Sequence, residues 1–384
     1  MTPSPATALY IHVPFCLGKC RYCDFYSLPL DPSLADRYVT AVAQQLQRSA
    51  DKLTQPLETV FFGGGTPSIL GASRLARLIE SIQPHLSADT EFSVEANPGA
   101  LDGDTLAAMV SGGVNRVSLG VQSFDNAELS LLGRPHTADQ ANEAIDAITG
   151  AGIDNWSLDL IHALPGQSID RWEKTVTEAV ATEPSHLSCY ALSFEEDTEF
   201  CDALAAGSLT EMPEDQQRQC FDLACELIGQ AGLEHYELSN FARPGSACRH
   251  NLTYWNNQPY VGLGPAAASY VDGRRWTNRP DLAGWLEAAD AGDDPPADSE
   301  QLTGPLAMAE TLMLGLRLID GVDRGTFAAR YGIDAAAAFP ETVSRYHRQE
   351  MLKITDSRLR LAAEARFVSD AILADFVAEA HDAD

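Results

Sequence analysis

The chain has 384 residues, which is enough for one large domain and a smaller one. A hydrophobic fraction of 45% is typical of a globular protein, and no run of about 18 apolar residues predicts a transmembrane helix. The formal net charge of −29 disfavours nonspecific nucleic-acid binding, because phosphate contacts need a surplus of Lys and Arg. The first residues lack the basic and apolar regions of a secretory signal, so we expect a cytoplasmic protein.

Apolar strand-like segments alternate with amphipathic helical segments over the first half of the chain. The expected strands are 8–13, 58–64, 90–98, 114–123, 154–166 and 185–193. The expected helices are 35–50, 73–83, 103–113, 137–152 and 170–181. This alternation predicts a parallel sheet with helices outside it. Six consecutive units favour a barrel or a partial barrel, although a doubly wound open sheet fits the alternation too.

The second half of the chain changes character. A helix is expected over 212–230, followed by a strand and a loop over 233–245. The acidic segment 290–304, rich in Pro and Gly, is typical of a linker. The remainder predicts a small, mainly helical domain. We therefore expect three parts, namely residues 1–240, 241–300 and 301–384.

Three cysteines lie on the loop after the first strand. Cys16, Cys20 and Cys23 form the pattern C-x3-C-x2-C, and thiolates are suited to iron–sulfur clusters or zinc. A structural zinc site needs four ligands, usually in two pairs, and no second C-x2-C pair is present. Three cysteines would leave one iron of a [4Fe–4S] cube without a protein ligand and open to a small molecule. Zinc and unligated cysteines are the alternatives.

Glycines and polar residues occur where the following strands end. The turn "FFGGGTPS" brings Gly64, Gly65 and Thr66 to the end of the second strand, where bare backbone can approach a ligand closely. The later strands end in, or are followed by, polar side chains: Glu95, Gln122, Arg134 and Asp159. Barrels build active sites at this end of their strands. Any one of these residues alone fits an ordinary loop, but their succession predicts a site.

The cysteine loop resembles that of the radical S-adenosylmethionine (radical SAM) enzymes. The resemblance implies that the methionyl group of S-adenosylmethionine chelates the open iron. It also implies that one electron from the cluster cleaves the sulfonium to give a 5'-deoxyadenosyl radical. The residues implied to contact S-adenosylmethionine are Tyr10, Tyr22, Gly64, Gly65, Thr66, Glu95, Gln122, Arg134 and Asp159.

The motifs resemble one group within that superfamily. "ALYIHVPFC", "FFGGGTPS", "EANPG", "GVNRVSLGVQSF", "LGRPH" and "LDLIHALPGQ" are similar, in order, to the anaerobic coproporphyrinogen III oxidase-like family. That family contains an oxygen-independent oxidase and a haem chaperone. The resemblance implies an α/β fold, a partial (β/α)6 TIM-like barrel, with a small, winged-helix-like C-terminal helical domain. The acidity of the chain argues against DNA binding by that domain.

Three features separate the branches of the family. The oxidases carry a further cysteine two positions after the third, where this chain has Phe25, and a longer segment before the cysteine loop. The stretch "HNLTYW" at 250–255 matches the H-N-x-x-Y-W signature of the haem chaperones. We therefore predict a haem chaperone that passes haem to an acceptor protein such as a respiratory enzyme. The alternatives are a coproporphyrinogen III oxidase and another radical SAM reaction.

The signature supplies a candidate for the haem site. Imidazole is a good ligand of haem iron, so His250 is the candidate ligand, and Tyr254 and Trp255 can stack on a porphyrin. A histidine that is merely hydrogen-bonded in a loop is the alternative. Cys248 is either a second ligand or a bystander. Relatives carry a histidine where this chain has Ala268, and the family allows a homodimer.

Overall fold

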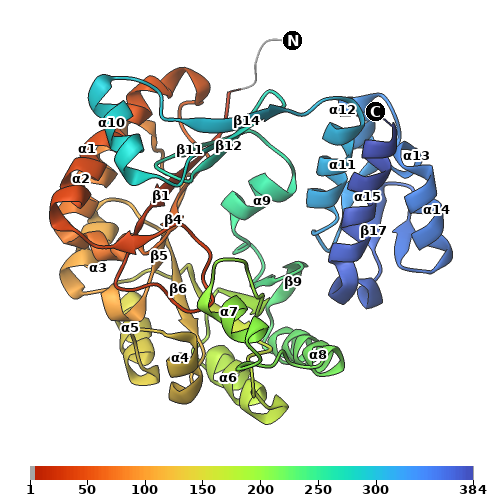
Figure 1. Ribbon diagram of the computed structural model, residues 1–384, viewed down its shortest axis with the longest axis horizontal. Helices are drawn as coiled ribbons and strands as arrows, with labels where there is room; N and C mark the ends of the chain where they lie inside the picture. The colour runs from red at the N-terminus through yellow and green to blue at the C-terminus, as the bar shows by residue number, and fades with distance from the viewer. Residues whose placement is uncertain (1–4, 384) are drawn as a thin grey trace.

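Six parallel strands form the centre of the structure, a computed structural model that describes residues 5–383 (Figure 1). They are β1 (Ala8–Val13), β4 (Thr59–Gly64), β5 (Glu91–Ala96), β6 (Arg116–Gln122), β7 (Trp156–His162) and β8 (His186–Ala191). The helices that connect them are α1 (Pro32–Arg48), α2 (Gly71–Ile82), α3 (Gly103–Ser111), α4 (Asn126–Leu132), α5 (Ala138–Gly150) and α6 (Ile169–Ala181). All six expected strands are confirmed, and α4 is a helix that the sequence did not predict.

Shorter elements complete this part of the chain. A parallel pair, β2 (Phe15–Cys16) and β3 (Leu28–Pro29), flanks the cysteine loop. Short 3-10 helices are η1 (Ala50–Lys52), η2 (Pro67–Leu70), η3 (Gln83–His85) and η4 (Pro98–Ala100), and a longer one, η5 (Ala363–Val368), lies in the C-terminal part of the chain. The helices that follow β8 are α7 (Glu199–Ala205), α8 (Glu214–Gln230), α9 (Arg249–Trp255) and α10 (Leu282–Ala291).

The central strands belong to a 12-stranded sheet that does not close on itself. Its order is β14-β13-β12-β11-β1-β4-β5-β6-β7-β8-β10-β9. The outer strands are β9 (Glu234–Glu237), β10 (Asn240–Ala242), β11 (Tyr260–Leu263), β12 (Ala268–Val271), β13 (Arg274–Asn278) and β14 (Ala297–Gln301). Strands β4 to β8 follow one another in chain order, whereas a doubly wound sheet reverses its order at a switch point. The predicted partial barrel is therefore confirmed.

One expectation was wrong. The segment 290–304 was expected to be a linker, but it contains β14, which pairs antiparallel with β13 at the edge of the sheet. Every residue of β14 is exposed and most are polar, so the strand has no alternation of apolar residues that would reveal it. Its acidic side chains also suit an edge strand, because charge discourages pairing with other chains.

The C-terminal part is a small, mainly helical domain, as expected. Its helices are α11 (Gly304–Gly315), α12 (Arg324–Tyr331), α13 (Ala335–Ala338), α14 (Pro340–Arg348) and α15 (Ser369–Ala383). A three-stranded antiparallel sheet has the order β15 (Val322–Asp323), β17 (Arg358–Leu361), β16 (Leu352–Ile354). Buried apolar residues, among them Leu312, Phe327 and Phe376, give this domain a core of its own. The proposed division at residues 240 and 300 stays a prediction.

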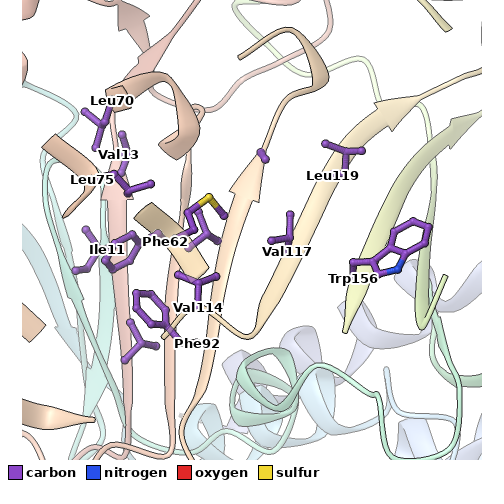
Figure 2. Close-up of a cluster of buried hydrophobic side chains, with 14 of the residues drawn as sticks. Ile11, Val13, Phe62, Leu70, Leu75, Phe92, Val114, Val117, Leu119 and Trp156 are labelled. Atoms are coloured by element: carbon purple, nitrogen blue, oxygen red, sulfur yellow. The ribbon is translucent and has the colours of Figure 1, made fainter. Parts of the chain in front are cut away.

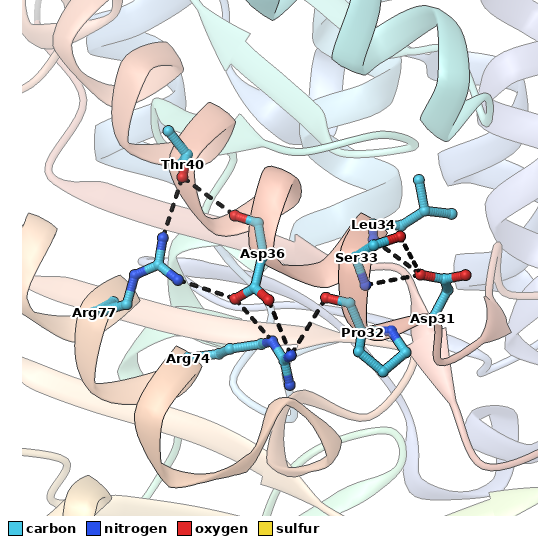
Figure 3. Close-up of polar contacts among 8 residues, drawn as sticks. All are labelled: Asp31, Pro32, Ser33, Leu34, Asp36, Thr40, Arg74 and Arg77. Atoms are coloured by element: carbon cyan, nitrogen blue, oxygen red, sulfur yellow. Dashed lines mark hydrogen bonds and ion pairs between the residues drawn. The ribbon is translucent and has the colours of Figure 1, made fainter.

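The main core lies between the outer face of the sheet and the helices (Figure 2). Phe62 of β4 and Phe92 of β5 are fully buried there, and their rings meet edge to face with centroids 5.0 Å apart. Polar contacts add to the packing at the surface, where Asp36 of α1 accepts hydrogen bonds from Arg74 and Arg77 of α2 (Figure 3). These ions are partly exposed, so the core and not the ion pairs sets the positions of the helices. Within residues 5–383 no helix has both the length and the apolarity to cross a membrane.

We predict that Phe62→Ala lowers the free energy of unfolding by about 3–5 kcal/mol, because the substitution leaves a cavity in a closely packed core. Denaturant unfolding of the barrel measures the change. Val110→Ala on α3 is the control, since Val110 is 40% exposed and its loss should change stability by no more than about 0.5 kcal/mol. Equal effects of the two substitutions would contradict this account of the core.

Candidate functional site

The inner face of the sheet carries polar side chains that the strand register brings together. In the register of β5 to β8, Glu95 pairs with Ser118, Gly120 with Asp159, and Asp159 with Ser188. Side chains of a strand alternate between its two faces, so paired residues point to the same side. Side chains on the outer face of these strands pack into the core, and side chains on the inner face line cavities. The strands of this parallel sheet contain many polar residues because their inner face borders cavities.

A cavity of about 450 Å³, here called the cluster cavity, lies at the carboxyl ends of these strands. It gathers most of the residues that the sequence singled out: Cys16, Cys20, Tyr22, Cys23, Gly64, Gly65, Thr66, Glu95, Gln122, Arg134 and Asp159. Neither Tyr10 nor His250 lines it. The structure therefore brings the cysteine loop and the strand-end residues into one place, as a barrel site requires, and leaves Tyr10 and His250 outside.

The donor set of the cluster cavity suits an iron–sulfur cluster. All three cysteines are free thiols, and Arg134 Nη1 donates to Cys20 Sγ at 3.3 Å. Among residues 5–383, no three His, Cys, Asp or Glu side chains converge as the ligands of a single metal ion would. Thiolates that bind three different irons of one cluster need not converge on a point. Three cysteines without a fourth therefore fit a cluster with one iron left for another ligand.

The glycine turn brings bare backbone to the wall of the cavity. Gly64 has φ of +104°, a conformation that residues with a side chain rarely adopt. A Cβ on Gly65 would lie 2.5 Å from the carbonyl oxygen of Phe15, so no larger residue fits there. Gly64 N–H donates to Glu95 Oε2 at 3.1 Å. The turn and the carboxylate are thus held together at the end of β4.

Two buried carboxyl groups give the cavity its electrostatic character. Burial and, to a smaller extent, the nearby Asp159 carboxylate raise the pKa of Glu95 to about 8, although the hydrogen bond from Gly64 N–H acts in the opposite direction. Burial also raises the pKa of Asp159, while hydrogen bonds from Ser188 and Ser118 oppose that rise. A cationic ligand group in the cavity would favour the charged form of both carboxylates.

Gln122 and Arg134 reach the cavity through unusual local geometry. The register of β6 and β7 shifts between Gly120 and Gln122, and Gln122 has φ of 70°. Bulges of this kind redirect side chains beside active sites. Arg134 Nη2 donates to the carbonyl of Gly120 at 2.5 Å, but its Nε is buried without a partner among the described residues. An unpaired buried donor suits an anionic or polar ligand group.

Two further cavities lie beside the cluster cavity. The inner cavity, about 290 Å³, is inside the barrel and is lined by Phe61, Asp159, His250 and others. The aromatic cavity, about 570 Å³, is lined by six aromatic rings: Tyr10, Phe25, Tyr26, Tyr254, Trp255 and Tyr260. Both cavities share the side chains of Tyr10, Glu95 and Tyr254. Glu95 also lines the cluster cavity, so one carboxyl group borders all three.

The "HNLTYW" stretch forms helix α9, and not a loop. The carboxylate of Glu91 accepts hydrogen bonds from the backbone N–H groups of Arg249 and His250, both at 3.0 Å, and so caps the helix from strand β5. Cys248 Sγ lies 3.6 Å from the same carboxylate and is 2% exposed. The start of α9 is thus fixed to the barrel by a residue 158 positions earlier in the chain.

His250 is buried at 1% exposure, and both of its ring nitrogens have partners. Nδ1 is 2.8 Å from Thr59 Oγ1, and Nε2 is 2.8 Å from the hydroxyl oxygen of Tyr254. Burial lowers the pKa of His250 to about 3, so the ring is neutral. In this conformation neither nitrogen is available to an iron, and the predicted ligand role of His250 stays a prediction. Ala268 lines the aromatic cavity and offers no ligand atom.

Sequence reasoning missed several residues of the site. Ser118 Oγ donates to Asp159 at 3.1 Å, and Arg116 Nη1 donates to Asn155 Oδ1 at 2.8 Å. Ser118 and Arg116 both belong to the segment "RVSLGVQ", in which every second residue is polar or glycine. This period of two indicates a row of side chains that faces the inside of the barrel. Glu91 also begins such a row. No local sequence pattern marks Thr59 as a residue of the site, because its hydrogen-bond partner His250 is 191 residues away.

Comparison with known proteins places this fold and this site in a class. The Radical SAM superfamily model matches residues 10–179, and the HemN C-terminal domain model matches residues 302–368. The structure of coproporphyrinogen III oxidase (HemN) from Escherichia coli, a radical SAM enzyme, aligns with a TM-score of 0.83. The alignment covers 97% of this chain and 90% of that one at 20% identity, which shows a shared fold. The class is radical SAM, and membership implies S-adenosylmethionine and an iron–sulfur cluster.

Curated relatives narrow the class to one family. A protein named heme chaperone HemW from Synechocystis sp. is 41% identical over 82% of this chain and 79% of its own length. Proteins of the same name from Bacillus subtilis and Escherichia coli are 32% and 35% identical, covering 99% and 88% of their own lengths. This chain therefore belongs to the HemW family, and the predicted resemblance is confirmed.

We predict that Glu95→Gln removes a pH dependence of stability in the ligand-free protein. The folded-state pKa of about 8 exceeds the ordinary value of 4.5, so the folded state binds more protons between these values. Stability due to this group is then lost as the pH rises through that window. The melting temperature of the wild type should fall with pH relative to that of Glu95→Gln. The exposed Glu80→Gln is the control, and equal slopes for all three proteins would contradict the prediction.

We predict that Glu91→Ala loosens α9, because it leaves two buried N–H groups unpaired at a cost of about 1–3 kcal/mol. Hydrogen–deuterium exchange across residues 249–255 should become faster. Glu91→Gln keeps one acceptor oxygen and should have a smaller effect. If both variants leave the exchange of α9 unchanged, the helix does not depend on this cap.

Proposed function

We propose that this protein is a haem chaperone, which binds haem and transfers it to an acceptor protein while holding a [4Fe–4S] cluster and S-adenosylmethionine. The observation that carries the proposal is the position of α9. The helix of the H-N-x-x-Y-W signature places Tyr254 and Trp255 in the wall of the aromatic cavity, which adjoins the cluster cavity through Glu95. The name of the HemW relatives supports the same function.

The proposed cofactor site uses the chain's own thiolates and polar groups. Cys16, Cys20 and Cys23 would hold the cluster, which with S-adenosylmethionine supplies one-electron cleavage chemistry when bound. Cys16 Sγ lies 3.5 Å from Thr66 Oγ1, which links the cysteine loop to the glycine turn. Arg134 beside Cys20 would offset the negative charge of the thiolates.

S-adenosylmethionine would be bound by the residues that surround these thiolates. Glu95 and Asp159 provide carboxylates for its cationic groups, and the turn at Gly64 and Gly65 provides open backbone. The remaining proposed contacts are Tyr22, Thr66, Gln122 and Arg134. Tyr10 lines the aromatic cavity and not the cluster cavity, so its contact with S-adenosylmethionine stays a prediction.

The aromatic cavity is the proposed site of the cargo. Its volume of about 570 Å³ lies within the range of about 300–1,000 Å³ usual for small-molecule sites. Flat aromatic side chains pack well against the faces of a conjugated ring. His250, from the same helix, supports the site from behind Tyr254 at 2.8 Å. All eight cysteines are free, which suits a reducing compartment, and we place the function in the cytoplasm.

A coproporphyrinogen III oxidase is the second candidate, and the fold shared with that enzyme favours it. The position of the oxidases' additional cysteine argues against it. Phe25 occupies that position, is 61% exposed and lines both the cluster cavity and the aromatic cavity. A hydrophobic ring there contributes to a binding surface for a flat molecule and supplies no thiol.

The two candidates differ in a direct measurement. The protein is reconstituted anaerobically with iron and sulfide and titrated with haemin, and a second sample receives coproporphyrinogen III, S-adenosylmethionine and a reductant. We expect a stoichiometric Soret band and no protoporphyrinogen. A chain lacking haem affinity that converts coproporphyrinogen III would be an oxidase, and the chaperone proposal would be wrong.

A further inference from the structure

The inner cavity is hollow because small polar side chains stand where branched apolar residues usually fill the interior of a barrel. Neighbouring strands β5 to β8 each carry a serine on the inner face: Ser93, Ser118, Ser157 and Ser188. The volume of about 290 Å³ corresponds to about ten water molecules at ~30 Å³ each. A small organic molecule therefore fits inside the barrel, in a space that the proposed cofactor and cargo sites leave unassigned.

A buried arginine lines this cavity. Among residues 5–383, Arg116 is the only lysine or arginine that is buried, at 2% exposure. Its Nη1 donates to Asn155 Oδ1 at 2.8 Å and to the carbonyl of Ser246 at 2.9 Å, and neither Nε nor Nη2 donates to a described residue. No carboxylate among the described residues forms an ion pair with it. A buried cation without an anion is costly, so the arrangement favours a negatively charged ligand group.

The acidic groups that face the inside of the barrel have other partners. The carboxylate of Glu91 accepts hydrogen bonds from the first turn of α9, and that of Asp159 accepts from Ser118 Oγ at 3.1 Å. Beside Arg116 in the register of β5 and β6, Ser93 has its Oγ buried without a partner among the described residues. The guanidinium and this hydroxyl are therefore donors that the protein itself leaves unused.

We propose that the inner cavity binds the carboxylate group of a small organic molecule, and that Arg116 holds that group. Because Nη1 is fixed by two oxygen acceptors, the edge formed by Nε and Nη2 is the free one. Two parallel N–H groups on this edge match the two oxygens of a carboxylate. The inference goes beyond the proposed haem function, because it adds a second binding site to the barrel.

The proposed carboxylate site adjoins the cluster cavity. Glu95, Ser118, Asp159 and Tyr190 line both cavities. Arg116 precedes Ser118 by two residues on β6, so it lies about 7 Å further from the carboxyl ends of the strands. Burial raises the pKa of Glu95 and of Asp159, which favours their neutral forms and reduces repulsion of an anion. A ligand held at Arg116 would extend towards the proposed cofactor site.

Two kinds of molecule present the same group to this site. One is a free organic acid, and the other is a porphyrin, whose propionate side chains end in carboxylates. The inner cavity shares Tyr10, Glu95 and Tyr254 with the aromatic cavity, so a ligand of one cavity borders on the other. The proposal names the carboxylate, and the experiment distinguishes its two sources.

The test is a calorimetric titration of the full chain, reconstituted with its iron–sulfur cluster, with butyrate. Butyramide, which has nearly the same shape and no charge, is the matched probe. We expect saturable binding of butyrate and at least tenfold weaker binding of butyramide. Arg116→Gln should weaken butyrate binding by about 10–100-fold, the effect of losing hydrogen bonds to a charged group.

Two further variants make the test specific. Arg243 Nε donates to the carbonyl of Pro184 at 3.1 Å, and Arg243 does not line the inner cavity, so Arg243→Gln should bind butyrate like the wild type. Ser188→Leu puts a larger side chain into the cavity and keeps Arg116, so it should abolish binding. Circular dichroism and the iron–sulfur absorbance show whether each variant is folded. The comparison of butyrate with butyramide needs no variant.

Competition identifies the source of the carboxylate. Haemin and haemin dimethyl ester, in which the propionates are esterified, are each added to the butyrate complex. Displacement by haemin alone assigns the carboxylate to a propionate, and any other result assigns it to a free acid. Both assignments support the site, and a chain without haem affinity would overturn only the proposed function.

Several outcomes would overturn the inference. They are the absence of saturable butyrate binding, equal binding of butyrate and butyramide, and wild-type affinity in folded Arg116→Gln or folded Ser188→Leu. A loss in Arg243→Gln as large as that in Arg116→Gln would also overturn it. Competition by chloride or inorganic phosphate as strong as that by butyrate itself would show a general anion site, and the assignment to a carboxylate would be wrong.

Discussion

The parallel register of β1 and β4 to β8 is the constraint on which the rest of the structure depends. Each strand is shifted so that polar residues from neighbouring strands, such as Glu95 and Ser118, or Asp159 and Ser188, share the inner face. A shift of one residue would turn these groups into the apolar core and expose the core residues to the cavities. Burying Glu95 and Asp159 is costly, and hydrogen bonds from Gly64 and Ser118 offset part of that cost.

Strand β5 connects the two ends of the site. Glu91 at its start holds the first turn of α9, and Glu95 near its end borders the cluster cavity. The two carboxyl groups lie four residues apart on the same face, or about 13 Å along an extended strand. A strand paired on both sides is rigid, so the distance between the proposed haem helix and the proposed cofactor site is fixed by the sheet and not by a loop.

Helix α9 is held on its other side by the C-terminal domain. The Arg317 guanidinium lies over the Trp255 ring, 4.6 Å from its centroid, and Asn257 Nδ2 donates to Thr311 Oγ1 at 2.8 Å. Trp255 Nε1 and Arg317 Nε are buried without partners among the described residues. The domain therefore packs against the helix whose Tyr254 and Trp255 line the aromatic cavity.

The sequence by itself determined the six strands, the cysteine loop and the residues of the cluster cavity. Those features depend on local periodicity and on strand ends, which a chain expresses within a few residues. The tertiary structure alone decided that Tyr10 and His250 lie outside that cavity, that "HNLTYW" is a capped helix, and that 290–304 contains an edge strand. The environment of His250 comes from Glu91 and Thr59, which lie 159 and 191 residues away. No local pattern encodes such partners, because only the packing of α9 against the barrel brings them together.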